Sequence, residues 1–543
     1  MCVPPQVFSI YTWNMVDRWI HRGRWEIFVA TLLVVTALAM FTLDERTRGL
    51  AASTASLAGT AGMLALLIGA PLALVLVRTN VPGRTGMLLI MTALLLVPLY
   101  VQAAAWQAAL DPQGWLTQAG ATALIQGFSG AVWIHTAAGI PWVVLIVGLG
   151  VWLAEPELEE EALLDASVFA VFRRVTLRRA AASAMVAGLW LAITISGEMT
   201  VTNLMQVRTL AEEIYTQFAL GDTPGDAASA SAAGTLATAW LILAALIVVT
   251  RLAPRHRHTS QRAPRLFRLG PWRWPCGMLA WTGTFALAGV PVASLIATVG
   301  IVITRQGDTW TRSWSTAKCL DVIANSPSRF GREFGWSLAI GSLAACLAVM
   351  IALPLAWSAR RGGWRALPAW LLVAACLAIP GPIVGIGLIW LVNQPGAPWL
   401  TNLYDNSIAA PLLAQTLRIL PLPILIMWHA LASVPDELPE AAATEGAGRL
   451  TRFLRIAVAS RLGPVALAWL VALAMAIGEL DASLLVVPPR VTLLSIEIFG
   501  LIHYGVNDYV AGICLVLVLG FFLVAASVWL VALRRMHAWH GRP

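Results

Sequence analysis

Long apolar runs are the feature that most constrains this chain. Stretches of about 17 to 25 residues with few charges follow one another along the whole sequence, and each is long enough to cross a hydrocarbon layer about 30 Å thick as a helix. Of the 543 residues, 59% are hydrophobic and 12% are charged, whereas soluble proteins have about 25% charged residues. The sequence therefore predicts an all-α polytopic membrane protein.

We expect about twelve transmembrane helices, with boundaries placed to within a few residues. They are expected near 26–43, 52–77, 86–106, 131–153, 181–205, 234–250, 277–304, 335–358, 367–392, 408–432, 463–486 and 510–533. Basic residues are concentrated on one side of these spans, as in the arginine-rich segment 251–274, whereas 107–130 has none. By the positive-inside rule this bias places both termini in the cytoplasm. It also accounts for the net charge of +8 without a nucleic-acid partner.

The two halves of the chain resemble each other. The sequence "ISGEMTVTNLM" at 195–205 is echoed by "AIGELDASLLV" at 476–486, and "GAPLALVLVRTNVPGR" at 69–84 by "IALPLAWSARRGGWR" at 351–365. Because each half has an even number of expected spans, both halves enter the membrane from the same side. The sequence thus predicts two parallel six-helix repeats, as in several transporter folds.

The repeat predicts the domain organisation. We expect a first repeat at 1–250, a basic cytoplasmic linker at 251–274 and a second repeat at 275–543. Glu160 and Glu440 are 280 positions apart, whereas Glu198 and Glu479 are 281 apart, so the first copy is one residue shorter between these points.

A short acidic, alanine-rich stretch occurs on the expected cytoplasmic side of each half. The first is "PELEEEALLDASVFAVFRRVTL" at 156–177, and the second is "PDELPEAAATEGAGRLTRFLRI" at 435–456. Alanine and glutamate favour helix, and Gly446 permits a sharp bend before an amphipathic helix resumes. A solvated connector would explain one such loop, but recurrence at the same place in both halves favours a docking surface.

The pattern E-A-A-x-x-E-G-A at Glu440–Ala447, followed by Phe453 and Ile456, resembles the EAA loop of ABC importer permeases. In that family the loop supplies a coupling helix that seats in a groove of the ATP-binding subunit. The resemblance implies coupling roles for Glu440, Ala441, Ala442, Gly446, Glu160, Ala162, Asp165 and Ala166. The first half departs from the pattern, because Glu161 stands at its second position and Ala166 replaces the glycine.

The resemblance covers nearly the whole chain and implies a fused pair of permease units of the type I importer fold. It implies a multi-pass protein of the bacterial inner membrane, in contact with membrane lipid, two copies of an ABC ATP-binding subunit and an external solute-binding protein. "GELDASLLV" followed by an arginine-containing loop resembles the ferric-iron branch. Thiamine, a small anion and polyamine remain alternatives.

On this interpretation, the energy for transport comes from ATP hydrolysis on another chain. A phosphate-binding loop needs GxxxxGK[ST], and the single lysine, Lys318 in "STAKCL", has no such glycines before it. We therefore expect no enzyme activity and no cofactor on this chain, with ATP used by the partner subunits. The six cysteines are scattered, which indicates neither a disulfide framework nor a firm metal site.

Charged residues inside spans are candidates for the translocation path. Glu198 and Glu479 occupy matched "G-E" positions late in the fifth span of each half, where they could contact a hard cation or cap a helix break. Arg418 and His135 each precede a proline, and a bond to backbone freed by a kink is the leading interpretation. If the same glutamates instead bound an ion whose movement drives transport, the chain would be an ion-coupled secondary transporter. This stays an alternative function, and a non-transporting scaffold is a third possibility.

Overall fold

The computed structural model describes residues 44–110, 126–152, 156–219, 266–306, 309–394 and 396–540, with scattered positions between 232 and 242. Within these residues seven helices are long and apolar enough to cross a membrane, or ten if each of three bent pairs forms one span. The chain is thus an all-α polytopic membrane protein, as its sequence predicts. The expected span 26–43 and most of 234–250 lie outside the described residues, so a total of twelve stays a prediction.

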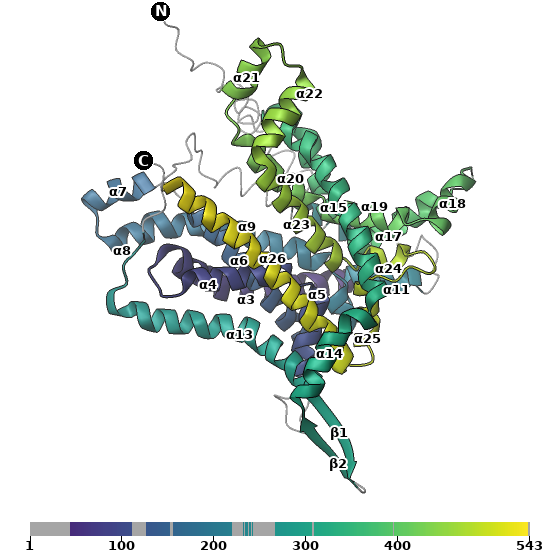
Figure 1. Ribbon diagram of the computed structural model, residues 1–543. Coiled ribbons are helices and arrows are strands. Elements are labelled where there is room, and N and C mark those ends of the chain that lie inside the picture. Colours follow the sequence, from purple (N-terminus) through teal and green to yellow (C-terminus); the bar gives the residue numbers. More distant parts are fainter. Residues whose placement is uncertain are drawn as a thin grey trace, which may run out of the picture. The chain divides into compact units, whose positions relative to one another are not determined.

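Helices make up nearly all of the described first half (Figure 1). In chain order they are α3 (Glu45–Arg78), α4 (Arg84–Leu96), α5 (Leu99–Leu110), α6 (Gly127–Trp152), α7 (Pro156–Asp165), α8 (Val168–Val171), the π-helix η1 (Phe172–Thr176), α9 (Leu177–Ser196), α10 (Thr200–Leu204) and α11 (Leu210–Ala219).

The second half adds one β-hairpin to a similar series of helices. Its elements are η2 (Gly270–Trp272), α13 (Arg273–Gly300), β1 (Ile301–Gln306), β2 (Thr309–Trp314), α14 (Thr316–Arg329), α15 (Gly331–Ala359), η3 (Gly363–Ala366), α16 (Leu367–Ala378), α17 (Gly381–Val392), α18 (Pro398–Asn406), α19 (Ala409–Ile419), α20 (Pro421–Ala432), α21 (Glu437–Thr444), α22 (Arg449–Thr451), the π-helix η4 (Arg452–Val458), η5 (Ala459–Arg461), α23 (Leu462–Gly478), α24 (Ser483–Val486), α25 (Leu494–Ile502) and α26 (Asp508–His540).

A proline breaks one expected span in each half. The helices α4 and α5 meet at 107°, and α16 and α17 at 103°. Pro98 and Pro380 stand at these breaks, and the residues before them, Val97 and Ile379, are extended. Proline has no N–H to donate and disfavours helical backbone in the residue before it. The expected third span of each half is therefore sharply bent and not straight.

A second interruption recurs as well. The expected spans 181–205 and 463–486 stop early, and each is followed by a very short helix, α10 or α24. Each short helix is followed by a non-glycine residue with positive φ, Gln206 at 55° and Arg490 at 75°, and then by α11 or α25. This recurrence of backbone irregularities supports the predicted repeat, although six spans per repeat stays a prediction.

The internal contacts divide the chain into two compact units. One combines Ala52–Glu213, Trp240–Trp336 and Val491–Pro543. The other combines Met1–Ala51, Ile214–Ala239 and Ser337–Arg490. Each unit thus draws on both halves of the sequence. The predicted repeat boundaries at 250 and 275 come from sequence similarity. A division by internal contacts does not test them, so they stay predictions.

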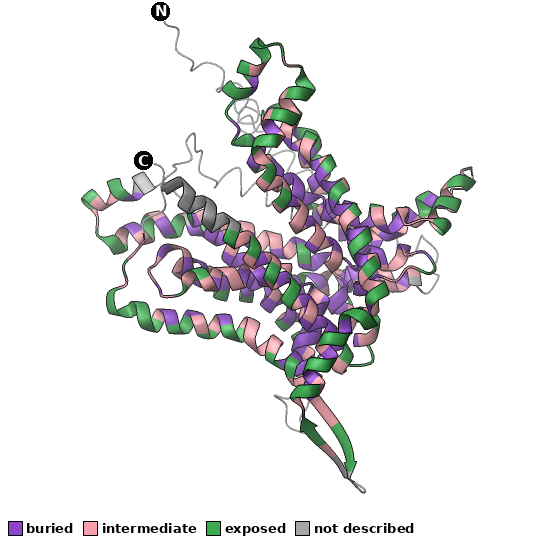
Figure 2. Cartoon of the chain, viewed as in Figure 1, coloured by how far each residue is buried: buried purple, intermediate pink, exposed green. Residues whose placement is uncertain are grey.

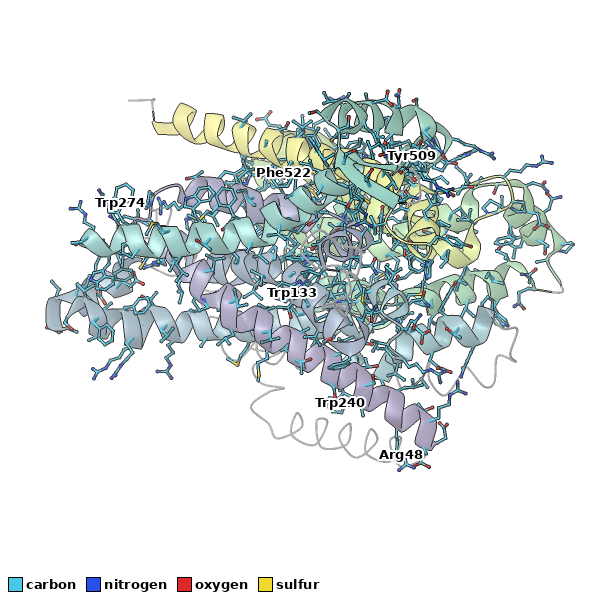
Figure 3. All side chains as sticks on the ribbon, turned by 90° about the horizontal axis from the view of Figure 1, so that it is seen from below. Arg48, Trp133, Trp240, Trp274, Tyr509 and Phe522 are labelled. Atoms are coloured by element: carbon cyan, nitrogen blue, oxygen red, sulfur yellow. The ribbon has the colours of Figure 1, made fainter. Side chains whose placement is uncertain are left out.

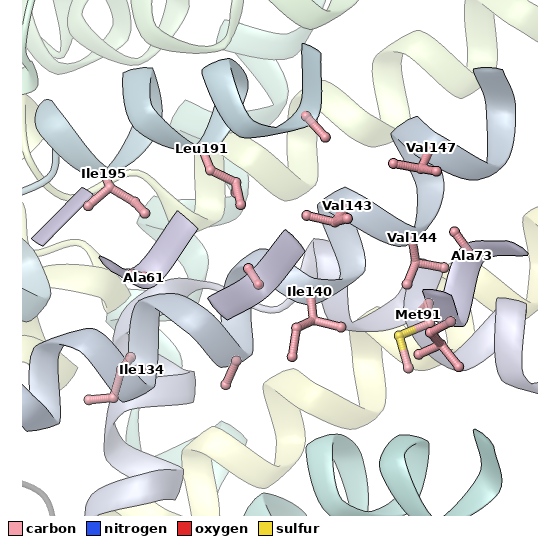
Figure 4. Close-up of a cluster of buried hydrophobic side chains, with 14 of the residues drawn as sticks. Ala61, Ala73, Met91, Ile134, Ile140, Val143, Val144, Val147, Leu191 and Ile195 are labelled. Atoms are coloured by element: carbon pink, nitrogen blue, oxygen red, sulfur yellow. The ribbon is translucent and has the colours of Figure 1, made fainter. Parts of the chain in front are cut away.

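The core of the unit around Ala52–Glu213 is built on α6 (Figure 4). This helix is apolar on every side, and two thirds of its most apolar window is buried, as expected for a helix packed on all faces. Its residues Ile140, Val143 and Val147 are buried together with Leu191 and Ile195 of α9.

Small residues let α6 and α9 approach closely. A Cβ on Gly150 of α6 would lie 2.4 Å from the Cβ of Ser183 on α9, so a larger residue there would force the helices apart. Small residues at helix contacts are typical of membrane proteins, where packing replaces the hydrophobic driving force.

The core of the other unit uses alanine in the same way. Ala344, Ala348, Ala352 and Ala356 follow one face of α15 and are all buried. They belong to one cluster with residues of α16, α20 and α23, while other faces of these helices are exposed (Figure 2), as suits contact with lipid.

The segment between α13 and α15 is largely structured. The helix α13 ends at Gly300, and β1 and β2 form an antiparallel hairpin in which Ile301 pairs with Trp314. Next comes α14, capped by the Ser315 hydroxyl, which accepts from the Lys318 amide. The Lys318 ammonium donates to the Ile301 carbonyl at 2.6 Å and lies 2.8 Å from the Asp508 carboxylate.

The C-terminal end of α14 is held against α26 in a similar way. The Arg329 guanidinium stacks over the ring of Tyr509, which Figure 3 labels, at 3.7 Å from its centroid. These contacts join the hairpin and α14 to the start of α26 within one unit.

Candidate functional site

The second acidic loop is a helix–bend–helix whose bend requires glycine. At the end of α21, the Gly446 amide donates to the Ala443 carbonyl at 3.1 Å, and the Ala447 amide donates to the Ala442 carbonyl at 2.9 Å. These two bonds form a Schellman motif, which needs a left-handed residue just past the helix. Gly446 has φ of 84° and fills that position.

The surface of this loop is mixed acidic and apolar. Glu440, Ala441 and Gly446 are exposed and Ala442 is half-buried, and Figure 2 shows the region of α21 and α22 as largely exposed. Leu450 next to them is 67% exposed. Apolar side chains that are exposed beside charges are typical of protein contact sites.

The first acidic loop has the same build without the glycine. Glu160 and Asp165 of α7 are exposed, and Ala162 and Ala166 are half-buried. The bend between α7 and α8 falls at Ala166. The departure from the family pattern therefore does not remove the bend.

A serine replaces the glycine as the device that forms this bend. The Ser167 hydroxyl accepts from the Ala170 amide at 3.4 Å and caps α8. Leu164 and Phe169 on either side are 85% and 72% exposed. The first loop thus also offers apolar side chains to a partner.

A π-helix follows the bend in both halves. It spans Phe172–Thr176 in η1 and Arg452–Val458 in η4. The first aromatic residue of each packs on another ring: Phe172 on Phe267 at 5.6 Å, and Phe453 on Trp357 at 5.8 Å between centroids. Since π-helical turns are rare and are frequent at functional sites, their recurrence here indicates a shared role.

A buried charge network holds the first loop. Arg78, the last residue of α3, donates to the Glu159 carboxylate of α7, and each side chain is 1% exposed. Arg78 also donates to the Val151 carbonyl at 3.1 Å and lies over the ring of Phe267. The Thr176 hydroxyl of η1 donates to the other Glu159 oxygen at 2.7 Å. This network joins α3, α6, α7 and η1.

The second loop is held by a more open pair. Arg360, just after α15, lies 2.9 Å from Asp436, whose side chain is 72% exposed. The guanidinium stacks on Trp357 at 3.7 Å. Burial lowers the pKa of Arg360 from its usual value, and the negative charge of Asp436 opposes that change.

The two matched glutamates cap helix breaks. One Glu479 oxygen accepts from the Ala482 amide at 2.7 Å, and the other accepts from the Ser483 amide at 3.1 Å and from the Ser483 hydroxyl. The Glu198 carboxylate accepts from the Val201 amide at 3.0 Å. A carboxylate at a helix N-terminus satisfies donors that have no partner in the helix. This geometry matches the structural alternative for both residues, and contact with cargo stays a prediction.

Arg418 and His135 differ in what they contact. The Arg418 guanidinium donates to the Ile379 carbonyl at 3.1 Å, directly before the break at Pro380 on another helix and not to backbone beside its own proline, Pro421. His135 is buried in α6, and its Nε2 lies 3.4 Å from a Glu198 oxygen. His135 therefore lies beside a capping carboxylate, and its placement does not follow from its own proline, Pro141.

Replacing Glu479 with alanine should lower the free energy of unfolding by about 1–2 kcal/mol, because two buried amides lose their acceptor. Glu198→Ala should cost less, since a single amide, that of Val201, loses its acceptor. Thermal unfolding in detergent measures both. Glu437→Ala is the control, because Glu437 is exposed and surface changes stay within about 0.5 kcal/mol. Equal stability of the Glu479 and Glu437 variants would contradict the capping role.

Sequence reasoning missed the Arg78–Glu159 pair. Glu159 belongs to a run of acidic residues in "ELEEE", and nothing in that run distinguishes the one member that is buried. The only signal was an arginine at the end of an apolar run, which membrane topology explains equally well.

No protein-family model matches the chain, and no curated protein matches its sequence. Among the described residues, no three histidine, cysteine, aspartate or glutamate side chains are grouped so that they could hold a metal ion.

Proposed function

We propose that this chain is the membrane permease of a binding-protein-dependent ABC importer, in the bacterial inner membrane with both termini cytoplasmic. The observation that carries the proposal is the pair of exposed helix–bend–helix loops, one in each half. Each is followed by a π-helical turn and held by an arginine at the end of a long helix.

The mechanism is alternating access driven by separate ATPases. Two ATP-binding subunits seat on the two loops, and their closure upon ATP binding moves the loops. The Arg78–Glu159 and Arg360–Asp436 contacts are placed to pass that movement to α3 and α15. The transport path then opens alternately to the outside and to the cytoplasm, while a solute-binding protein delivers the cargo from outside.

Ferric iron is the cargo that the sequence resemblance implies, with thiamine, a small anion and polyamine as alternatives. An uptake assay with each cargo would decide among them. The cavity described in the next subsection favours the small anion.

A tagged pull-down from native membranes in gentle detergent, with mass spectrometry of the bound proteins, tests the importer. We expect a P-loop ATPase at about two copies per chain, and its loss in Glu440→Lys. Asp405→Lys on α18 is the control, because Asp405 is also exposed but lies outside both loops. If the chain came out alone and moved solute in liposomes without ATP, the secondary-transporter alternative would replace this proposal.

A further inference from the structure

An open cavity of about 350 Å³ lies in the unit that contains Ala52–Glu213. Asn203, Gln206, Arg208, Glu212 and His503 line it. Its volume is in the range of small-molecule sites. None of these residues belongs to the acidic loops or to the capping glutamates.

Backbone geometry brings these side chains together. Gln206 has φ of 55°, a conformation that a non-glycine residue adopts only where the surroundings support it. The turn at Gln206 separates Asn203 in α10 from Arg208 before α11, and His503 follows the end of α25. A hydrogen bond of 3.0 Å between His503 Nε2 and Asn203 Oδ1 joins two segments that are 300 residues apart.

The hydrogen bond between His503 and Asn203 leaves one amide N–H of Asn203 that a ligand could accept. His503 Nδ1 lies 2.8 Å from the Phe499 carbonyl, so this nitrogen must carry a proton. Nε2 then bonds to Asn203 either as a second N–H donor or as an acceptor from the turned amide. In both arrangements Asn203 retains an amide N–H that no described residue accepts.

Arg208 supplies a positive charge that forms no ion pair with a described residue. Its side chain is exposed and makes no hydrogen bond or ion pair with any described residue. Glu212, which also lines the cavity, has other interactions within the chain. A guanidinium with free N–H donors next to amide donors matches the geometry of an oxyanion.

We propose that this cavity binds a small tetrahedral oxyanion such as phosphate or sulfate, through Arg208, Gln206 and Asn203, with His503 holding Asn203 in place. The inference rests on the proposed function for its role: in the proposed topology the cavity faces the outside, where it receives a small anionic cargo. The binding itself needs neither the ATPase nor the solute-binding protein.

Equilibrium binding of radiolabelled inorganic phosphate to the purified full chain tests the site. We expect saturable binding in phosphatidylcholine nanodiscs, and a loss of at least about tenfold in affinity in Arg208→Gln. Asn203→Leu should weaken binding similarly. Arg312→Gln on β2 is the matched control, because it removes the same charge from another exposed arginine that does not line the cavity, and it should bind as the wild type does.

Two further arms separate the possible sources of the anion. Nanodiscs that contain phosphatidylglycerol should bind free phosphate equally well if the site takes a soluble oxyanion. Loss of phosphate binding only in those nanodiscs would show that the site takes a lipid headgroup, which overturns the cargo role. Absence of saturable binding, or equal losses in Arg208→Gln and Arg312→Gln, would overturn the site. Saturable phosphate binding by a chain that also moves solute in liposomes without ATP would leave the site standing and overturn the importer.

Discussion

Arg78→Met should lower the free energy of unfolding by about 3–5 kcal/mol. The change removes the cation from a buried pair and leaves the Glu159 carboxylate with the Thr176 hydroxyl, which donates to its other oxygen. A buried charge that loses its partner keeps its desolvation penalty without the attraction that offset it. Chemical unfolding of the purified chain in detergent measures the change.

A double-mutant cycle measures the interaction energy of the Arg78–Glu159 pair separately from the effect of replacing each residue alone. Arg78→Met with Glu159→Leu should restore most of the lost stability, because an apolar pair of similar volume often replaces a buried ion pair at little cost. Arg360→Met is the matched control and should cost about 1 kcal/mol or less, since the carboxylate it leaves behind on Asp436 is mostly in water. Equal costs for Arg78→Met and Arg360→Met would contradict the buried network.

On the proposed function, Gly446→Ala should reduce coupled uptake and affinity for the proposed ATPase partner about tenfold. Alanine in the left-handed region costs about 1–2 kcal/mol, and about 1.4 kcal/mol is a factor of ten in an equilibrium. Nothing lies within 4 Å of a Cβ on Gly446, so the effect comes from backbone strain and not from a clash. Surface plasmon resonance with the ATPase and uptake in liposomes measure the two effects.

The neighbouring glycine provides an unusually close control. Gly448 also has open space around a Cβ, but its φ is −65°, which alanine adopts freely. Gly448→Ala should therefore behave almost as the wild type does. If both alanines impaired binding equally, the left-handed bend would not be the feature that the partner requires.

The loops connect these two predictions. The glycine sets the shape that a partner would contact, and the arginine network determines how firmly the loop follows the span behind it. Because both charges that hold the first loop are buried, whereas the carboxylate that holds the second, on Asp436, is mostly in water, we expect the first loop to be the more rigid of the two.

The amino-acid sequence by itself determined the class of the protein, the acidic stretches and the bend at Gly446. Apolar run length depends only on bilayer thickness, and the left-handed preference of glycine is local, so neither needs tertiary contacts. The sequence repeat also pointed to Glu198 and Glu479 as an equivalent pair, and both cap a break.

Only the tertiary structure decided which charges are buried and what they contact. The burial of Glu159, the approach of Asn203 to His503 and the contact of Arg418 with Ile379 join segments that are 81, 300 and 39 residues apart. Such contacts depend on how bent and broken helices pack. The bends at Pro98 and Pro380 could be suspected from proline alone, but their angles of 107° and 103° are set by the neighbouring helices, because proline removes a hydrogen bond without dictating where the chain then goes.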